Sequence, residues 1–206
     1  MYLFKTPGWL KMLYPGRVWH IPVREKILYL TFDDGPHPEI TPFVLKQLAA
    51  YGAKASFFCI GQNVERYPQI YRQIIEAGHS VGNHTYRHKN GFRTSVKDYL
   101  EDVKEAGSLI RSDLFRPPYG RLKGRQARQL KNYRIIMWDV LSGDFDQRLK
   151  KETCLKMLLR KTKPGSIIVF HDSQKAWERL EYALPAMLEH FKGAGYRFEN
   201  ILQTPS

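Results

Sequence analysis

Residues 27–61 read ILYLTFDDGPHPEITPFVLKQLAAYGAKASFFCIG, a pattern typical of one strand–helix–strand unit. The apolar run over residues 27–33 predicts a strand, residues 41–50 predict a helix, and residues 55–61 predict the next strand. A strand, a covering helix and a second strand in this order are the building unit of a parallel sheet. The stretch therefore predicts an α/β fold.

The same alternation continues along the chain. Further strands are predicted at residues 80–83, 114–116, 133–140, 166–171 and 196–201, and further helices near 63–77, 95–112, 126–132, 151–161 and 177–191. Seven strand–helix units in 206 residues predict one small barrel of about seven parallel strands. We expect residues 1–26 to form an N-terminal extension and residues 27–206 to form the catalytic domain.

The N-terminal residues do not have the pattern of a signal peptide. Prolines and glycines interrupt them, and they contain neither an unbroken apolar core nor a small-residue cleavage site. No stretch approaches the roughly 20 apolar residues of a membrane-spanning helix. These features favour a cytoplasmic or peripheral protein and leave the compartment otherwise open. Cys59 and Cys154 are expected to be unpaired buried thiols.

The net charge of +13 is the unusual bulk property of the chain. Such a charge favours contact with an anionic polymer or a membrane surface, and it also serves simple solubility. Two basic faces are predicted on helices outside the barrel and away from the strand ends; their members are Arg121, Arg125, Arg128, Lys156, Arg160 and Lys163. No specific nucleic-acid partner is expected.

Polar side chains gather where the predicted strands end. They are Asp33 and Asp34, Asn83 and His84, Arg116, Asp139 with Asp144, and His171 with Asp172. In an α/β barrel the carboxyl ends of the strands converge on one rim, which is where active sites form. We therefore expect a catalytic site at this rim.

The motif HTYRH, residues 84–88, predicts a metal site. On a helical turn, His84 and His88 would share one face and one ion. Two histidines and one aspartate give the three protein ligands that a catalytic zinc site typically has. Arg116 is expected to pair with one carboxylate of the first loop, and His171 is a candidate proton donor. The alternatives are surface histidines and a structural ion pair.

The motifs TFDDGP, HTYRH, RPPYG and VFHD resemble, in order and spacing, those of polysaccharide deacetylases with the NodB homology domain, the fourth carbohydrate esterase family. The resemblance extends from about Ile27 to Ile201. It implies a distorted (β/α) barrel and hydrolysis of acetamido groups on sugars such as N-acetylglucosamine. It also implies a divalent metal, first Zn²⁺, with Co²⁺ or Ni²⁺ as alternatives, and a polysaccharide or oligosaccharide substrate.

The resemblance assigns a role to each motif residue. Asp33 matches the general base, Arg116 the arginine that orients it, and His171 the general acid. The metal ligands correspond to Asp34, His84 and His88, and the Tyr119 amide to an oxyanion donor.

The fourth family motif departs from the usual Asp–Trp pair. Here Asp144 matches the acid that orients His171, and Phe145 replaces a tryptophan in the groove, while Asp139 is the alternative partner. Two other functions stay open beside N-deacetylation. One is removal of O-acetyl groups, and the other is a basic binding module, which would be expected to lack a ligand or the base.

Overall fold

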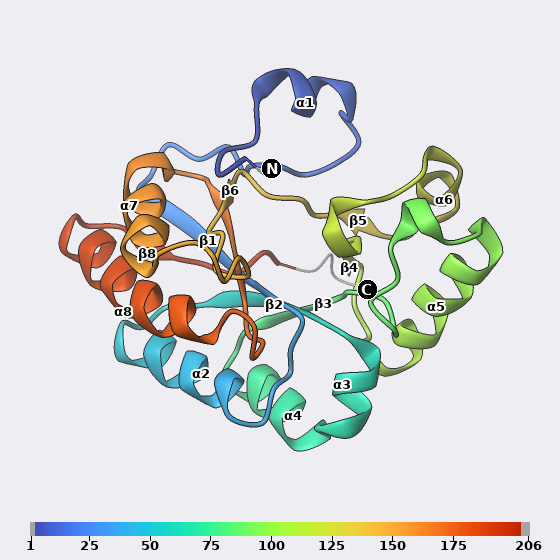
Figure 1. Ribbon diagram of the computed structural model, residues 1–206, viewed down its shortest axis with the longest axis horizontal. Helices are drawn as coiled ribbons and strands as arrows, with labels where there is room; N and C mark the ends of the chain where they lie inside the picture. The colour runs from blue at the N-terminus through green and yellow to red at the C-terminus, as the bar shows by residue number, and fades with distance from the viewer. Residues whose placement is uncertain (1–2, 203–206) are drawn as a thin grey trace.

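The computed structural model describes residues 3–202 and has parallel strands curled into a half-barrel (Figure 1). The sheet order is β5-β4-β3-β2-β1-β7-β6, and β8 pairs with the start of β1. The strands are β1 (Ile27–Asp33), β2 (Ala55–Cys59), β3 (Ser80–Asn83), β4 (Leu114–Phe115), β5 (Arg134–Ile135), β6 (Val140–Leu141), β7 (Ile167–His171) and β8 (Arg197–Phe198). This arrangement confirms the predicted α/β fold, a distorted barrel of about seven parallel strands.

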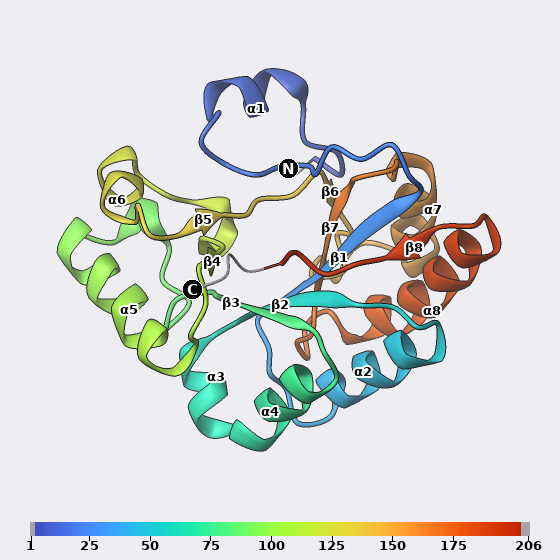
Figure 2. The same ribbon diagram turned by 180° about the vertical axis from the view of Figure 1, so that it is seen from behind.

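Helices cover the outer side of the sheet, as Figure 2 shows from behind. They are α2 (Ile40–Ala50), α3 (Gly61–Arg66), α4 (Pro68–Glu76), α5 (Val96–Leu109), α6 (Gly124–Gln129), α7 (Lys151–Lys161) and α8 (Trp177–Gly193). The short helix α1 (Gly8–Leu13) stands apart from them, at the open side of the half-barrel between α6 and α7 (Figure 1). Two short 3₁₀ turns, η1 (Gly91–Arg93) and η2 (Pro118–Gly120), lie in the loops after β3 and β4. No helix within residues 3–202 is both long and apolar enough to cross a membrane.

Two predicted elements are divided in the structure. The helix predicted over residues 63–77 breaks at Tyr67, because Pro68 has no amide hydrogen to continue α3 and instead begins α4. The strand predicted over residues 133–140 becomes β5 and β6. Between them the backbone leaves the sheet ladder, and Met137 N donates to Val18 O at 2.7 Å.

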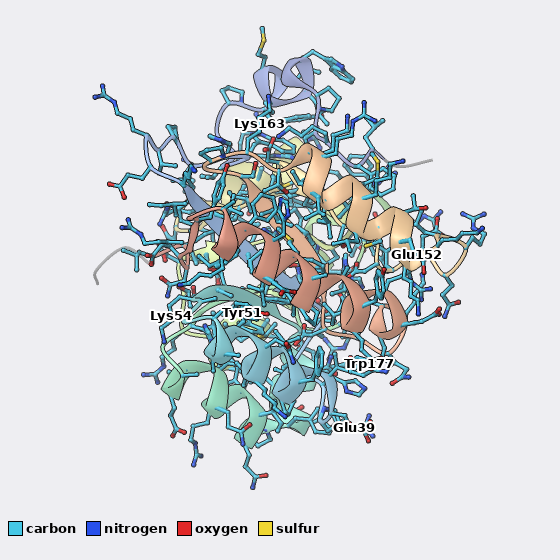
Figure 3. All side chains as sticks on the ribbon, turned by 90° about the vertical axis from the view of Figure 1, so that its left-hand side faces the viewer. Glu39, Tyr51, Lys54, Glu152, Lys163 and Trp177 are labelled. Carbon is cyan, nitrogen blue, oxygen red and sulfur yellow. The ribbon has the colours of Figure 1, made fainter. Side chains whose placement is uncertain are left out.

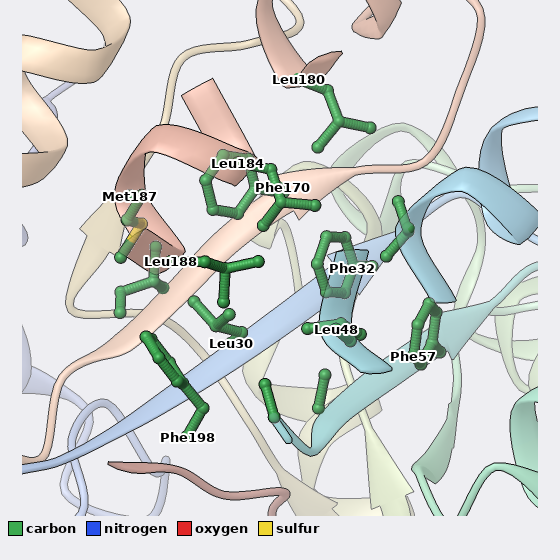
Figure 4. Packing of buried hydrophobic residues seen from close by; sticks show 14 of the residues in the cluster. Leu30, Phe32, Leu48, Phe57, Phe170, Leu180, Leu184, Met187, Leu188 and Phe198 are labelled. Atoms are coloured by element: carbon green, nitrogen blue, oxygen red, sulfur yellow. The ribbon is translucent and has the colours of Figure 1, made fainter. Parts of the chain in front are cut away.

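The main core lies between the central strands and the helices α2 and α8 (Figure 4). Phe32 of β1 is fully buried, and its ring stacks on Phe57 of β2 at 5.0 Å and on Phe170 of β7 at 5.8 Å between centroids. Leu184 and Leu188 of α8 pack into the same cluster. Burial on both faces explains why these strands are apolar without alternation. The rigid centre fixes the strand ends that carry the site.

The N-terminal residues cover both edges of the half-barrel. Lys5 pairs with Val140 of β6, and Val18 pairs with Ile136 just after β5. Asp139 is 1% exposed and joins this segment to the domain, since its carboxylate accepts hydrogen bonds from Lys5, Lys11 and Ser166. Covered edges cannot pair with other chains. The predicted boundary after residue 26 stays a prediction, and residues 1–2 and 203–206 lie outside the described part.

Candidate metal centre and active site

A cleft of about 630 Å³ opens at the carboxyl ends of the strands. Predicted site residues from the ends of four strands and the loops that follow them line the cleft: Asp33 at the end of β1 and Asp34 after it, His84 and His88 after β3, Tyr119 after β4, and His171 at the end of β7. Arg116 and Asp144 are fully buried behind them. The strand ends therefore bring these eight residues together, as parallel strands of one curled sheet must.

Asp34, His84 and His88 present their ligand atoms within 4.8 Å of one another. His88 Nε2 lies 3.2 Å and His84 Nε2 lies 3.8 Å from Asp34 Oδ1. That oxygen is buried and has no hydrogen-bond partner of proper geometry. An unpaired buried carboxylate oxygen facing two imidazole nitrogens is costly unless a cation joins them. The three residues therefore fit a divalent metal.

The histidines meet through a loop and not through a helix. The prediction of a helical turn is wrong, because residues 84–88 have no helical hydrogen bonding and both Thr85 (φ 65°) and His88 (φ 53°) are left-handed. The two imidazole rings lie 5.0 Å apart between centroids. The i, i+4 spacing still brings them together, since two left-handed residues turn the loop back on itself.

Asp102 of α5 holds the loop of residues 84–88 in place. It is 1% exposed, and its Oδ2 accepts hydrogen bonds from the backbone amides of Tyr86 and Arg87, both at 3.0 Å. Its Oδ1 lies 3.2 Å from the Arg87 guanidinium and 3.6 Å from the Lys89 ammonium. A buried carboxylate thus sets the path of the chain between the two histidines.

His84 is held as a neutral ligand. Its Nδ1 donates to the carbonyl oxygen of Arg116 at 2.7 Å, which leaves Nε2 free to face Asp34. Burial lowers the pKa of His84 to about 4, although the nearby charge of Asp33 opposes the shift. At neutral pH the imidazole is therefore uncharged, as metal binding requires.

Asp34 is held as a carboxylate. Burial raises its pKa, but the close contact with His88 and the positive charge of His171 outweigh burial, so the net pKa lies below the ordinary value. Two imidazoles and one carboxylate form a donor set that suits a borderline divalent ion. The residues therefore fit such an ion in charge as well as in position.

Asp33 has a different partner from its neighbour. Arg116 is fully buried, and its Nη1 lies 2.6 Å from Asp33 Oδ1 and 2.8 Å from Thr31 Oγ1. The other guanidinium nitrogens donate to the carbonyl oxygens of Ile136 and Met137. The predicted pairing of Arg116 with one carboxylate of the first loop is thus found. The positive charge lies beside Asp33, and the imidazoles lie beside Asp34.

Asp172 holds the first loop in place. Thr41 Oγ1 donates to Asp172 Oδ2 at 2.5 Å, and the Gly35 amide donates to Oδ1 at 3.0 Å. A Cβ on Gly35 would lie 2.1 Å from Oδ2, so only glycine fits there. Burial raises the pKa of Asp172 to about 8. The residue belongs to the VFHD motif, yet only the fold reveals that it contacts the DDGP loop.

His171 ends β7, beside Asp33 in the sheet register, and is paired with Asp144. Asp144 Oδ1 is 2.7 Å from His171 Nδ1, and Oδ2 accepts the His171 backbone amide at 2.8 Å. Burial lowers the pKa of His171, but the charge and hydrogen bond of Asp144 outweigh burial and raise it to about 9. Asp139, the alternative partner, instead binds Lys5 and Lys11. A protonated imidazole therefore faces the cleft at neutral pH.

The rest of the cleft wall is apolar with two cations at its rim. Phe145 lines it and meets the His171 ring edge-on at 5.2 Å, beside three residues that carried no expectation, Trp138, Leu141 and Val169. Arg121 and Lys175 also line the cleft. The prediction that Arg121 lies on an outer helix is wrong, because it follows η2 and α6 begins only at Gly124.

Replacing Asp102 by asparagine should weaken metal binding. The neutral amide cannot hold both backbone amides and both cations, so the histidine loop loses its fixed geometry. Loss of such outer partners typically lowers metal affinity by about 10- to 100-fold. Equilibrium dialysis with Zn²⁺ measures the effect. Glu105→Gln is the control, because it changes only an exposed partner of Arg87; an equal loss in both variants would contradict a role for Asp102.

The comparisons with known proteins agree with this geometry. A sequence model described as polysaccharide deacetylase matches residues 20–137. The peptidoglycan-N-acetylglucosamine deacetylase of Bacillus cereus is 32% identical over 191 residues, which are 89% of this chain and 90% of the relative. The chitooligosaccharide deacetylase of Azorhizobium caulinodans is 32% identical over 166 residues, covering 76% of this chain and 79% of that one.

A solved structure gives the same result for the fold. The crystal structure of the Bc1960 peptidoglycan N-acetylglucosamine deacetylase, in complex with a hydroxamate, superposes with a TM-score of 0.83 at 28% identity. The superposition covers 93% of this chain and 94% of that one. The chain therefore belongs to the polysaccharide deacetylase family, the metal-dependent hydrolases that remove acetyl groups from N-acetylated sugars.

Proposed function

We propose that this chain hydrolyses the acetamido group of N-acetylglucosamine units in a polysaccharide such as peptidoglycan, or in chitin-like oligomers. The observation that carries the proposal is the unpaired buried oxygen of Asp34 between two imidazoles, beside the separately paired Asp33. The names of the peptidoglycan and chitooligosaccharide deacetylases that resemble the chain support this substrate class. The apolar wall next to His171 suits an acetyl methyl group.

The proposed ligands Asp34, His84 and His88 would hold Zn²⁺, with Co²⁺ or Ni²⁺ as alternatives, because imidazole and carboxylate suit these ions. When bound, such an ion acts as a Lewis acid toward water and the amide carbonyl. Asp33 is the proposed general base, which accepts a proton from the attacking water. Arg116 orients Asp33 through the buried ion pair.

The proposed general acid is His171, at the end of β7 and next to Asp33 of β1 in the sheet register. Its imidazolium donates a proton to the departing amine, and Asp144 maintains the charged form. The backbone amide of Tyr119 is the proposed hydrogen-bond donor to the oxyanion, and the left-handed conformation of Tyr119 (φ 59°) sets the direction of that amide. Base and acid thus come from the ends of the neighbouring strands β1 and β7, and each has its own buried partner, Arg116 for Asp33 and Asp144 for His171.

Two other functions are alternatives to this proposal, and one further contact is proposed in addition to it. An O-acetyl group would meet the same residues, so an esterase is the second candidate. A binding module without catalysis is disfavoured by the complete set of ligands, base and acid. We also propose contact of the basic faces with an anionic polymer or a membrane surface, and hence a peripheral location, with no specific nucleic-acid partner.

Acetate release tests the proposed reaction. The purified, zinc-loaded protein should release acetate from N-acetylglucosamine oligomers or peptidoglycan fragments faster than from matched O-acetylated oligosaccharides. His84→Ala should lose both bound metal and turnover, because one of three ligands is removed. Faster release from the O-acetyl substrate would favour the esterase. No release from any substrate by a metal-loaded protein would leave the binding module.

Asp33 and Asp34 should separate on mutation, although they are neighbours. Asp33→Asn should keep the metal and lower kcat by roughly 10² or more, the scale of general base catalysis. Asp34→Asn should weaken metal binding first, because it removes charge from a proposed ligand. Metal content and kcat, measured for both variants, check the assignment. Equal metal loss and equal kinetics would contradict it.

Replacing Asp144 by asparagine should move the alkaline limb of the pH profile to lower pH. The carboxylate of Asp144 raises the pKa of His171 to about 9, so its removal lowers that pKa and the imidazolium is lost earlier as pH rises. Asp139→Asn is the control, since Asp139 contacts Lys5 and Lys11 instead. A limb that moves only in the Asp139 variant would refute the pairing.

A further inference from the structure

The helix α1 exposes one apolar face. Trp9, Met12 and Leu13 are spaced i, i+3 and i+4, so they share one side of the helix, and they are 62%, 80% and 64% exposed. Leu10, between them in sequence, packs instead against the cluster around Trp19. Tyr14, 40% exposed, follows directly. Large apolar side chains gathered at such exposure mark an interaction surface more often than scattered single ones do.

This face is built into the fold. Lys11, on the helix, lies 2.5 Å from a carboxylate oxygen of the buried Asp139, and Lys5, before it, lies 2.5 Å from the other oxygen. After the helix, the Trp19 indole donates to Tyr14 O at 3.3 Å, and the Arg17 guanidinium lies 4.2 Å from the Tyr14 ring centre. Contacts on both sides hold α1 in one position. The domain therefore presents the apolar face in a defined place.

Two basic segments lie on either side of α1. Lys5 Nζ donates to the carbonyl of Lys161 at 3.2 Å, which places the end of α7 beside the N-terminal segment. Arg17 donates to Leu122 O at 3.3 Å, which places the segment before α6 on the other side. Figures 1 and 2 show α1 between α6 and α7, and Figure 3 places Lys163 next to the N-terminal loop.

The charges of these segments are almost all positive. Residues 121–134 contain six lysines and arginines and no acidic residue, and residues 150–163 contain six with Glu152 alone opposing them. Lys156, Arg160 and Lys163 are all exposed. An apolar face with cations on both sides complements one environment, an anionic membrane surface.

We propose that α1 and its basic neighbours dock this enzyme on an anionic lipid bilayer as a peripheral protein. The tryptophan, methionine and leucine would enter the boundary between headgroups and acyl chains, and the lysines and arginines would contact lipid phosphates. Tryptophan and tyrosine are the residues that prefer this boundary. A soluble polyanion attracts the same cations but gains nothing from the apolar face, so the bilayer is the partner that uses both features.

The docking face is connected to the catalytic cleft. Thr6 Oγ1 donates to the Trp138 carbonyl at 2.7 Å, and the Trp138 side chain lines the cleft. A side-chain hydrogen bond therefore joins the segment that carries α1 to the backbone of a residue in the cleft wall. A docked enzyme would hold its cleft near the membrane, where it reaches polysaccharide close to the lipid surface.

Vesicle binding tests the proposal on the full chain. Wild type should co-sediment with vesicles of phosphatidylglycerol and phosphatidylcholine far better than with pure phosphatidylcholine. The triple variant Trp9→Ser, Met12→Ser, Leu13→Ser should bind at least about tenfold more weakly. The matched control Ile75→Ser, Leu109→Ser, Tyr182→Ser removes apolar side chains exposed elsewhere and should bind as wild type. Both variants should keep wild-type turnover of a soluble oligosaccharide.

Further experiments distinguish binding to lipid from binding to a soluble polyanion, and a loss of binding from a loss of folding. Lys156→Glu, Arg160→Glu and Lys163→Glu together should weaken vesicle binding, as should 1 M salt, which shortens the Debye length to about 3 Å. Brominated lipid should quench tryptophan emission in wild type and less in Trp9→Phe, a conservative change that tests insertion even if the serine variant fails to fold. Unchanged vesicle binding by the folded serine variant, or binding of polyphosphate but not of vesicles, would overturn the proposal.

Discussion

The buried ion pair between Arg116 and Asp33 is the interaction on which the site depends. Its two partners come from β1 and from the end of β4, and the guanidinium also holds Thr31 and the backbone after β5. Removing one partner of such a pair typically costs about 3–5 kcal/mol, because the other charge stays buried and unpaired. The pair therefore joins β1 to the segments after β4 and β5 at the rim, and it leaves Asp34 as the carboxylate that faces the two imidazoles.

The pairing of Arg116 with Asp33, and not with Asp34, decides how the other charged groups of the site are arranged. With Arg116 next to Asp33, the imidazoles of His84 and His88 lie beside Asp34. A further buried acid, Asp144, makes His171 cationic at the end of the neighbouring strand β7. The proposed base, Asp33, and the proposed acid, His171, have opposite roles, which require different environments. Here two separate buried partners supply that difference. Asp102 and Asp172 then hold the two loops in register with the strands.

Much of this arrangement can be predicted from sequence, because parallel strands bring their carboxyl ends to one rim. The bounds of β1 and β3, the pairing of Arg116 with the first loop and the proximity of His84 to His88 follow from local pattern and spacing. Nothing in the sequence around Thr85 and His88 indicates that their backbones are left-handed. The spacing of the two histidines alone therefore favours a helical turn, which the structure does not have. Likewise, nothing local separates Asp102 from its acidic neighbours Glu101 and Glu105, or predicts that Asp139 binds Lys5 and Lys11.

Anomalous diffraction from zinc-soaked crystals, recorded above and below the zinc absorption edge, tests the central claim most directly. The account predicts one peak at about 2.0–2.2 Å from an Asp34 oxygen and from the Nε2 atoms of His84 and His88. Arg116 should remain paired with Asp33 in the same crystal. A peak bound to Asp33 with Arg116 displaced, or zinc at residues outside this set, would contradict the account.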